Sequence, residues 1–311
     1  MLALLPAVYL GWGVGANDAA NTFGPQIGAG IIAFRRAVVL AAVFAFLGAV
    51  GEGRKTFATV GGLTRLRPQT AAVATLGAGV SVHLMTALGM PISTSHAIVG
   101  ALLAVGTTEP AGIHRGILAR VLASMLTAPV GAGVVAYLLY RLLAALQRSG
   151  GLDARRFDRL VRVTAVLVGC YAAYALGSNN VGNAMAPAVA AGVLAPTAGA
   201  VLGGAAIAAG VLTFSRRVIL LVGNQITALD PASALVAAAA TALTTHLFTQ
   251  VGVPVSTSQA MVGAVVGVGL TKGIVAVNRR IFWLVPAGWL ASILAAGALT
   301  YLGLGALALA R

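Results

Sequence analysis

The chain has 311 residues, of which 59% are hydrophobic and only 8% are charged, and its formal net charge at pH 7 is +14. A soluble domain carries about a quarter charged residues, so this composition excludes an ordinary soluble protein and predicts one that lies in a lipid bilayer. The single cysteine, Cys170, excludes an internal disulfide framework. The positive charge does not indicate nucleic-acid binding, because the arginines gather in short segments between apolar stretches, as the loops of membrane proteins do.

Six apolar stretches carry few or no charges, and each is long enough for most or all of a helical crossing of about 20 residues. They cover residues 37–51, 71–89, 117–140, 161–176, 232–252 and 281–310. None shows the alternation of a transmembrane barrel strand, so we predict an all-α, multi-pass integral membrane protein. The densest group of arginines lies between residues 141 and 162. The positive-inside rule predicts that this segment is cytoplasmic, at the cell (plasma) membrane.

The first polar segment, GVGANDAANTFGP at residues 13–25, stands where a spanning helix is expected. It places Asn17, Asp18 and Asn21 between glycines, and glycine and asparagine are poor residues for a helix interior. We therefore expect the helix to break here and to hold ions. A carboxylate at the bilayer centre costs about 2.5–3.5 kcal/mol even on the mild insertion scale, so Asp18 is predicted to be functional. The alternative is a polar contact between helices that pack through small residues.

The second polar segment, PISTSH at residues 91–96, follows an apolar stretch and begins with a proline that predicts a sharp turn. It offers three consecutive hydroxyls, on Ser93, Thr94 and Ser95. One hydroxyl is enough to cap a helix. A helix N-terminus with free amides and further hydroxyls is suited to bind an anion.

Both polar segments recur in the second half of the chain, in the same order and at nearly the same spacing. GANDAAN at 15–21 returns as GSNNVGN at 177–183, and PISTSHAIVGAL at 91–102 returns as PVSTSQAMVGAV at 254–265. His83 and His246 are in register with the second pair of segments, and we assign them no role. We therefore divide the chain into a first repeat (1–146), a basic connecting loop (147–162) and a second repeat (163–311). Duplicated halves are the usual plan of secondary transporters.

The duplicated segments predict an oxyanion site with a coupled cation. An anion of charge −2 about 5 Å from Asp18 meets a repulsion of about 6–7 kcal/mol at an effective dielectric constant of about 20. Binding therefore requires a proton on Asp18 or a cation beside it, and Asp18, Asn21 and Asn183 are the hypothetical ligands of Na⁺. The motifs contain no constellation of nucleophile, base and metal ligands, so we expect no enzyme and no cofactor besides Na⁺ or H⁺ as the coupling ion.

With both motif pairs the sequence resembles the inorganic phosphate transporter (PiT) family, whose signature is a duplicated G-x-N-D-x-x-N-A/T-x-G-P, each copy followed by P-x-S-T-S/T-H. GANDAANTFGP and PISTSH match closely, and GSNNVGNAMAP and PVSTSQ match more loosely. The resemblance implies two inverted-topology repeats with broken helices and re-entrant hairpins. It also implies a secondary active transporter that imports phosphate with Na⁺ or H⁺ by alternating access, and a possible homodimer.

The resemblance also assigns site residues by motif position. For substrate it implies Ser93, Thr94, Ser95, Ser256, Thr257, Ser258, Asn17 and Asn179. For cation binding and coupling it implies Asp18, Asn21, Asn180, Asn183 and, from the segment VGEGRK, Glu52, which we expect near Asp18.

Two departures from the signature leave the carried ion open. Asn180 stands where the family commonly has aspartate, and Gln259 stands where histidine is usual. Phosphate near neutral pH keeps an O–H group that needs an acceptor, whereas sulfate needs donors only. The alternatives to phosphate import are therefore a sulfate permease coupled to H⁺ and, as a different class of protein, an anion channel.

Overall fold

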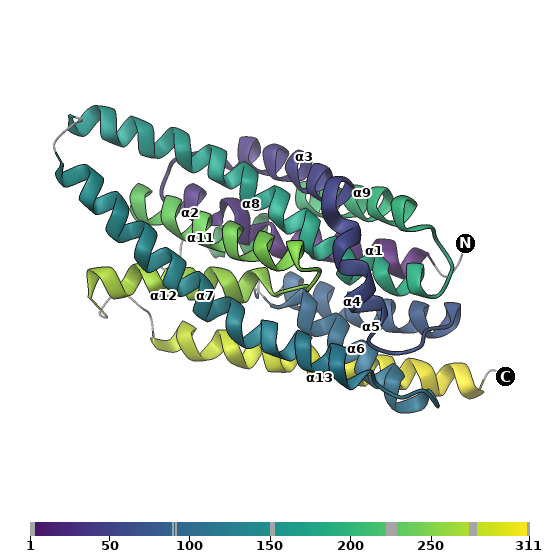
Figure 1. The fold of residues 1–311 in the computed structure, drawn as a ribbon. Coiled ribbons are helices and arrows are strands. Elements are labelled where there is room, and N and C mark those ends of the chain that lie inside the picture. The colour runs from purple at the N-terminus through teal and green to yellow at the C-terminus, as the bar shows by residue number, and fades with distance from the viewer. Residues whose placement is uncertain are drawn as a thin grey trace.

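The structure is a computed structural model that describes residues 4–88, 90, 92–149, 153–221, 229–273 and 279–309, with the backbone alone for 221 and 279–286. The regular elements of these residues are all helices, and the described ranges contain no strand, only an isolated bridge between Thr64 and Ile113. Figure 1 shows them as one elongated bundle. The helices are α1 (Leu5–Asp18), α2 (Ala20–Gly28), α3 (Phe34–Glu52), a 3-10 helix η1 (Gly53–Thr56), α4 (Phe57–Gly61), α5 (Pro68–Ala87), α6 (Thr94–Thr108), α7 (Arg115–Arg148), α8 (Ala154–Ala190), α9 (Pro196–Phe214), α10 (Arg216–Leu221), α11 (Pro231–Gln250), α12 (Thr257–Lys272) and α13 (Arg279–Leu309).

Seven helical spans among the described residues are long and apolar enough to cross a membrane. They include the six predicted stretches, and α9 is the seventh, which the sequence analysis did not count. The prediction of an all-α membrane protein with several crossings is therefore confirmed.

The predicted connecting loop 147–162 is helical over most of its described length. Helix α7 continues to Arg148 and α8 begins at Ala154, after Asp153, whose side chain accepts a hydrogen bond from the backbone N–H of Arg156. The pair Asp158–Arg162, with its N–O distance of 2.8 Å, supports the first turns of α8. With 34 and 37 residues, α7 and α8 are each longer than about 50 Å, against a hydrocarbon core of about 30 Å. Their joined ends extend beyond the other helices in Figure 1.

Two pairs of helices form hairpins whose tips meet inside the bundle. Helices α5 and α6 form hairpin 1, and α11 and α12 form hairpin 2; in Figure 1 they approach the centre from opposite ends. Each returning helix begins with a serine cap: Ser93 accepts from the N–H of His96, and Ser256 accepts from the N–H of Gln259. At about 1.5 Å per residue, the 15 residues of α6 and the 16 of α12 are too short for a full crossing. Gly89 and Pro91, at the predicted turn of hairpin 1, lie outside the described residues.

The prediction that the helices break at the asparagine segments is wrong for the second half. In the first half the break is limited to a single residue. Helix α8 runs without interruption through GSNNVGN. In the first half only Ala19 separates α1 from α2, and its φ of −54° and ψ of −29° are helical. The asparagine side chains find partners on other helices, as described below, so the backbone does not have to open to satisfy them.

The glycines of these segments allow close helix packing. A Cβ atom on Gly15 would lie 1.9 Å from the carbonyl oxygen of Ile207 on α9. A Cβ atom on Gly177 would lie 1.9 Å from the carbonyl oxygen of Ala45 on α3. These glycines let the backbones of two helices approach each other closely, and any larger residue would prevent that approach.

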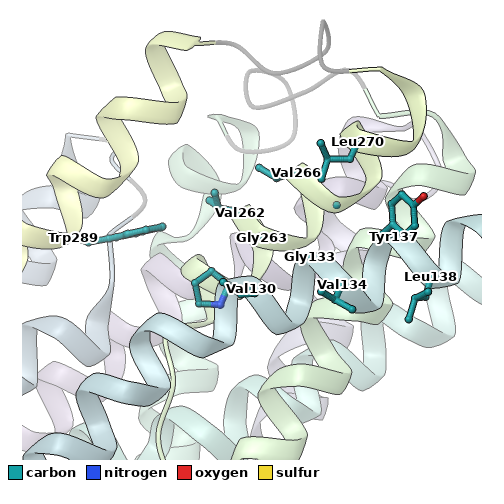
Figure 2. Close-up of a pocket in the computed structure, with 12 residues that line it drawn as sticks. Val130, Gly133, Val134, Tyr137, Leu138, Val262, Gly263, Val266, Leu270 and Trp289 are labelled. Carbon is teal, nitrogen blue, oxygen red and sulfur yellow. The ribbon is translucent and has the colours of Figure 1, made fainter.

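An apolar groove of about 520 Å³ lies between α7 and α12, with Trp289 of α13 at one end (Figure 2). Valine, leucine, glycine and proline line most of it, together with Tyr137 and Trp289. An anion site needs hydrogen-bond donors and positive electrostatic potential. The residues that line this groove are mostly apolar, so we place the anion site elsewhere.

Candidate ion and anion site

Asn17 fastens the first hairpin to α1. Its Nδ2 donates to Thr86 Oγ1 at 2.9 Å and to the carbonyl oxygen of Met90 at 3.1 Å. Its Oδ1 accepts from the backbone N–H of Ile92 at 3.2 Å. Both ends of the amide are therefore used to hold the non-helical tip of the hairpin.

Asn179 fastens the second hairpin to α8 in the same way. Its Nδ2 donates to Thr249 Oγ1 at 2.9 Å and to the carbonyl oxygen of Thr245 at 3.5 Å, and its Oδ1 accepts from the N–H of Val255 at 3.0 Å. The resemblance placed Asn17 and Asn179 among the substrate ligands, but here their side chains position the hairpins. Sequence analysis missed the threonine partners, although Thr86 and Thr249 are in the same register as the two hairpin segments.

Two further asparagines reach across to the opposite hairpin. Asn21 Nδ2 on α2 donates to Ser258 Oγ on α12 at 3.0 Å, and Asn183 Nδ2 on α8 donates to Ser95 Oγ on α6 at 2.9 Å. The polar helix of each half is thereby bonded to the hairpin of the other half.

The serine hydroxyls extend these contacts from tip to tip. Ser95 Oγ donates to the carbonyl oxygen of Val255 at 3.0 Å, and Ser258 Oγ donates to the carbonyl oxygen of Ile92 at 2.8 Å. The two hairpin tips are therefore bonded directly to one another.

Asp18 lies at the centre of these contacts with 1% of its surface exposed. Its Oδ2 accepts from Thr94 Oγ1 at 2.6 Å and from Asn180 Nδ2 at 2.7 Å. The carboxylate thus joins α1 to hairpin 1 and to α8 of the other half.

Several buried side-chain oxygens in this region have no hydrogen-bond partner among the described residues: Asp18 Oδ1, Asn180 Oδ1 and Asn183 Oδ1, and, on hairpin 2, Thr245 Oγ1 and Gln259 Oε1. Asn180 is bonded to Asp18, and Asn183 lies three residues along α8, on the same face of the helix. A buried acceptor without a partner costs about 1–3 kcal/mol, so this arrangement favours a bound cation or proton. A carboxylate with two amide oxygens is the ligand type that hard cations prefer. Asn21 was predicted as a sodium ligand together with Asp18 and Asn183; its hydrogen bonds to other described residues use Nδ2, and Asn180 adds a further unpartnered oxygen beside Asp18.

The predicted hydroxyl residues are all buried at the hairpin tips, with exposed fractions of 4% or less. Ser93 and Ser256 cap their helices, and Thr257 Oγ1 lies 3.4 Å from Asn21 Nδ2. The structure therefore brings together every predicted site residue except one.

That exception is Glu52, whose contacts are with other residues than Asp18. At the end of α3, Glu52 Oε2 lies 3.0 Å from His246 Nε2 and 3.3 Å from Lys55 Nζ. The expectation that Glu52 lies near Asp18 finds no support in these contacts, because α3 directs Glu52 toward α11.

An all-helical bundle with several membrane spans and a buried polar centre between two hairpin tips defines an integral membrane transport protein. A sequence model of the phosphate transporter family matches residues 14–153 and 144–300, which together cover most of the chain. The chain therefore belongs to the phosphate transporter family; it is a membrane transporter and not an enzyme.

Individual relatives agree with this assignment. A protein of Chlamydia pneumoniae is 29% identical, with 94% of this chain and 96% of the relative covered, and one of Pyrococcus furiosus is 27% identical, with 96% and 93% covered. Both bear the name "Putative phosphate permease". A solved structure named "The sodium-dependent phosphate transporter" superposes with a TM-score of 0.90 at 23% identity and covers 99% of this chain and 98% of its own. At that identity the superposition establishes the shared fold.

Proposed function

We propose that this protein is a secondary active transporter that imports inorganic phosphate together with Na⁺ across the plasma membrane. In this proposal two inverted-topology repeats, each with a re-entrant hairpin, alternate access to one site at their interface. The observation that carries the proposal is the set of contacts that cross between the halves, Asn21–Ser258 and Asn183–Ser95, beside three buried oxygens without partners.

The hairpin tips supply what an oxyanion needs. The N-termini of α6 and α12 offer backbone amides and a favourable helix dipole, and Thr94, Ser95 and Ser258 offer hydroxyls. In the described arrangement these hydroxyls donate to protein oxygens. Phosphate binding therefore requires the tips to separate, which exchanges contacts between the tips for contacts with the anion. That exchange is a physical basis for alternating access.

The coupling ion follows from the charge on Asp18. A phosphate dianion cannot approach a bare carboxylate without the repulsion estimated above, so a cation must be bound first or together with it. The unpartnered oxygens of Asp18, Asn180 and Asn183 form an oxygen-only ligand set suited to Na⁺. The name of the solved structure with the same fold supports sodium over protons.

Phosphate is favoured over sulfate by the acceptors at this site as well as by the family. Monohydrogen phosphate must donate its O–H to an oxygen, and Asp18 and the asparagine side chains supply such oxygens beside the hydroxyls. Sulfate has no proton to donate, so it makes no use of an acceptor beside the hydroxyls.

The test is uptake of labelled phosphate and of labelled sulfate into proteoliposomes under an imposed Na⁺ or H⁺ gradient. We expect phosphate to accumulate with the Na⁺ gradient and sulfate not to accumulate. Sulfate uptake that follows the H⁺ gradient would make the protein a sulfate permease. Flux that only dissipates the anion gradient would make it a channel.

Two variants test the site in the same assay. Asp18→Asn and Ser93→Ala are each expected to reduce uptake, and wild-type uptake by both would contradict the proposed site. Light scattering from the purified protein tests the homodimer that the family implies.

A further inference from the structure

A second polar cluster, separate from the contacts of Asp18, lies where α3 meets α8 and the last turns of α11. Glu52 Oε2 lies 3.0 Å from His246 Nε2, and Glu52 Oε1 accepts from the hydroxyl of Tyr174 at 3.3 Å. On the far side of the imidazole, the hydroxyl of Tyr171 lies 2.7 Å from His246 Nδ1. Only 20% of the His246 side chain and 24% of the Glu52 side chain are exposed, so the pair is largely shielded from solvent.

The charged and titratable groups that face His246 come from each element packed around it. Glu52 comes from α3, Lys55 from η1, and Tyr171 and Tyr174 from α8, the two tyrosines with ring centroids 5.5 and 5.9 Å from the imidazole. On its own helix the neighbour is Gln250, which is neutral and bonded to Glu52. Within the described part of the chain, no other charged side chain forms a hydrogen bond or ion pair with this cluster.

The hydrogen bonds of the cluster fit both charge states of the imidazole. Neutral His246 can donate from Nε2 to Glu52 and accept at Nδ1 from the hydroxyl of Tyr171. In its other tautomer, Nε2 accepts from the amide nitrogen of Gln250, 2.7 Å away, and Nδ1 donates to Tyr171. When a proton is added, both ring nitrogens donate, and the Tyr171 hydroxyl rotates to accept. The added charge then forms an ion pair with Glu52 at the existing distance, while the amide nitrogen of Gln250, 2.7 Å from Nε2, turns away from the new N–H.

The cluster is connected to the tip of hairpin 2, where α11 ends. Gln250, the last residue of α11, accepts from Lys55 Nζ at 2.5 Å. Two residues further on, the carbonyl oxygen of Gly252 accepts from Thr59 Oγ1 at 2.6 Å. The φ of Gly252 is +74°, a conformation that glycine adopts readily and that turns the chain into the tip. The pair Glu52–His246 therefore belongs to the contact that fastens hairpin 2 to the first half.

We propose that His246 is a proton-binding site paired with Glu52, and that its protonation fastens the tip end of α11 in hairpin 2 to the first half of the molecule. The proton is a second cation in the transport cycle, besides the Na⁺ assigned to Asp18. Because the ion pair strengthens a contact of the docked hairpin, acid favours the described arrangement and slows the separation of the tips. The transport consequence rests on the proposed function, whereas the effect on stability does not.

The molecule contains its own control for this proposal. His83 occupies the matching position in the first half, but it stacks between Trp12 and Phe214, with ring centroids 5.5 and 5.4 Å away. Phe214 stands where the register of the asparagine segments would place the counterpart of Glu52. Protonation of His83 therefore creates no ion pair with a carboxylate.

The experiment compares wild type, His246→Gln, Glu52→Gln and His83→Gln as purified full-length protein, with thermal unfolding midpoints measured from pH 8 to pH 5.5, the range in which histidine titrates. Glutamine keeps polar groups but cannot take up the proton. We expect acid to raise the wild-type midpoint relative to His246→Gln and Glu52→Gln, because the ion pair of protonated His246 with Glu52 exists only in the folded protein. His83→Gln should follow wild type. A pH profile of His246→Gln that coincides with wild type would overturn the proposal.

A second readout is phosphate uptake by the same proteins over the same pH range. We expect a several-fold fall in wild-type and His83→Gln uptake toward pH 5.5, and a nearly flat profile for His246→Gln. If no protein transports phosphate while the unfolding profiles differ as expected, the proton site stands and the proposed function fails. If uptake is robust but equally pH-dependent in His246→Gln and wild type, the proton site fails and the proposed function stands.

Discussion

The two asparagine segments, one in each half, share their packing and differ in their charge. In both, a glycine contacts a helix backbone, a first asparagine fastens a hairpin and a last asparagine reaches the opposite hairpin. Between these asparagines, the first half has Asp18 and the second half has Asn180, and the two side chains are hydrogen-bonded to each other. The molecule thus keeps two copies of the structural contacts and one copy of the carboxylate.

This difference distinguishes the residues that position the site from the residue that we propose to couple the cation to the anion. Contacts that recur in both halves, such as those of Asn17 and Asn179, hold the hairpins in place. In the proposed function, the feature that occurs once, the Asp18 carboxylate, sets the charge of the centre and hence the number of cations that a transported anion requires. One buried carboxylate is consistent with one tightly held cation beside it.

The largest effect is expected from making the two segments alike. Asp18→Asn removes the only carboxylate of the two segments, and the loss of charge-assisted contacts worth about 1.5–3 kcal/mol should lower Na⁺-driven phosphate uptake by about 10- to 100-fold. The measurement is initial uptake in proteoliposomes.

The matched control for that variant exchanges the two side chains. Because Asp18 Oδ2 and Asn180 Nδ2 are 2.7 Å apart, the double variant Asp18→Asn/Asn180→Asp moves the carboxylate by a few ångströms, and it should recover part of the uptake. If the exchange is no better than Asp18→Asn alone, the carboxylate has a role specific to the first half.

The shared packing is tested next, by filling a glycine contact. In Gly177→Ala the new methyl group meets the backbone carbonyl of Ala45, which cannot rotate away. We expect the free energy of unfolding to fall by about 1–3 kcal/mol. The control is Gly131→Ala on α7, where a Cβ meets nothing within 4 Å, and it should not destabilise the protein. Equal stability of the two variants would refute the close approach.

A smaller effect distinguishes the two crossing asparagines. Asn21→Ala and Asn183→Ala each remove one hydrogen bond between the halves, worth about 0.5–1.5 kcal/mol, so uptake should fall by about two- to tenfold in each. Of these two asparagines, Asn183 is the one whose buried Oδ1 has no partner among the described residues, so Asn183→Ala should raise the Na⁺ concentration needed for half-maximal uptake more than Asn21→Ala does. An equal shift in both variants would contradict the assignment of Asn183 as a cation ligand.

The smallest effect concerns the serine caps. Ser93→Ala removes the cap of α6 and should cost about 1 kcal/mol of stability, whereas Ser93→Gly should cost only a few tenths. If the Ser93 hydroxyl also binds phosphate, uptake stays reduced in Ser93→Gly although stability recovers. Wild-type uptake in Ser93→Gly would restrict Ser93 to capping.

The membrane class, the duplication and the polar positions could be predicted from sequence because each depends on residue type and spacing. A long apolar stretch has few alternatives to a helix in a bilayer, and serines after a proline turn mark a helix start. The same reasoning brought Asp18, Thr94 and Ser258 together, because duplicated motifs imply one shared interface.

The path of α8 and the partners of individual side chains could not be predicted in this way. Glycine and asparagine have low helix propensity, but tertiary contacts override propensity when side chains find partners on neighbouring helices, as Asn179 and Asn183 do. Residue type also does not say which amide faces a ligand and which fastens a hairpin. Glu52 was misplaced for a related reason, since its contact with His246 joins residues 194 positions apart.

The most direct test of the central claim is calorimetric titration of phosphate into the purified wild-type protein and into Asp18→Asn, with Na⁺ and with an inert cation replacing it. If one site binds the cation at Asp18 beside the anion, Na⁺ tightens phosphate binding to the wild type. Binding to Asp18→Asn is then the same with either cation. By thermodynamic reciprocity, phosphate must tighten Na⁺ binding by the same factor. Phosphate affinity in the wild type that does not change with Na⁺ would contradict the account.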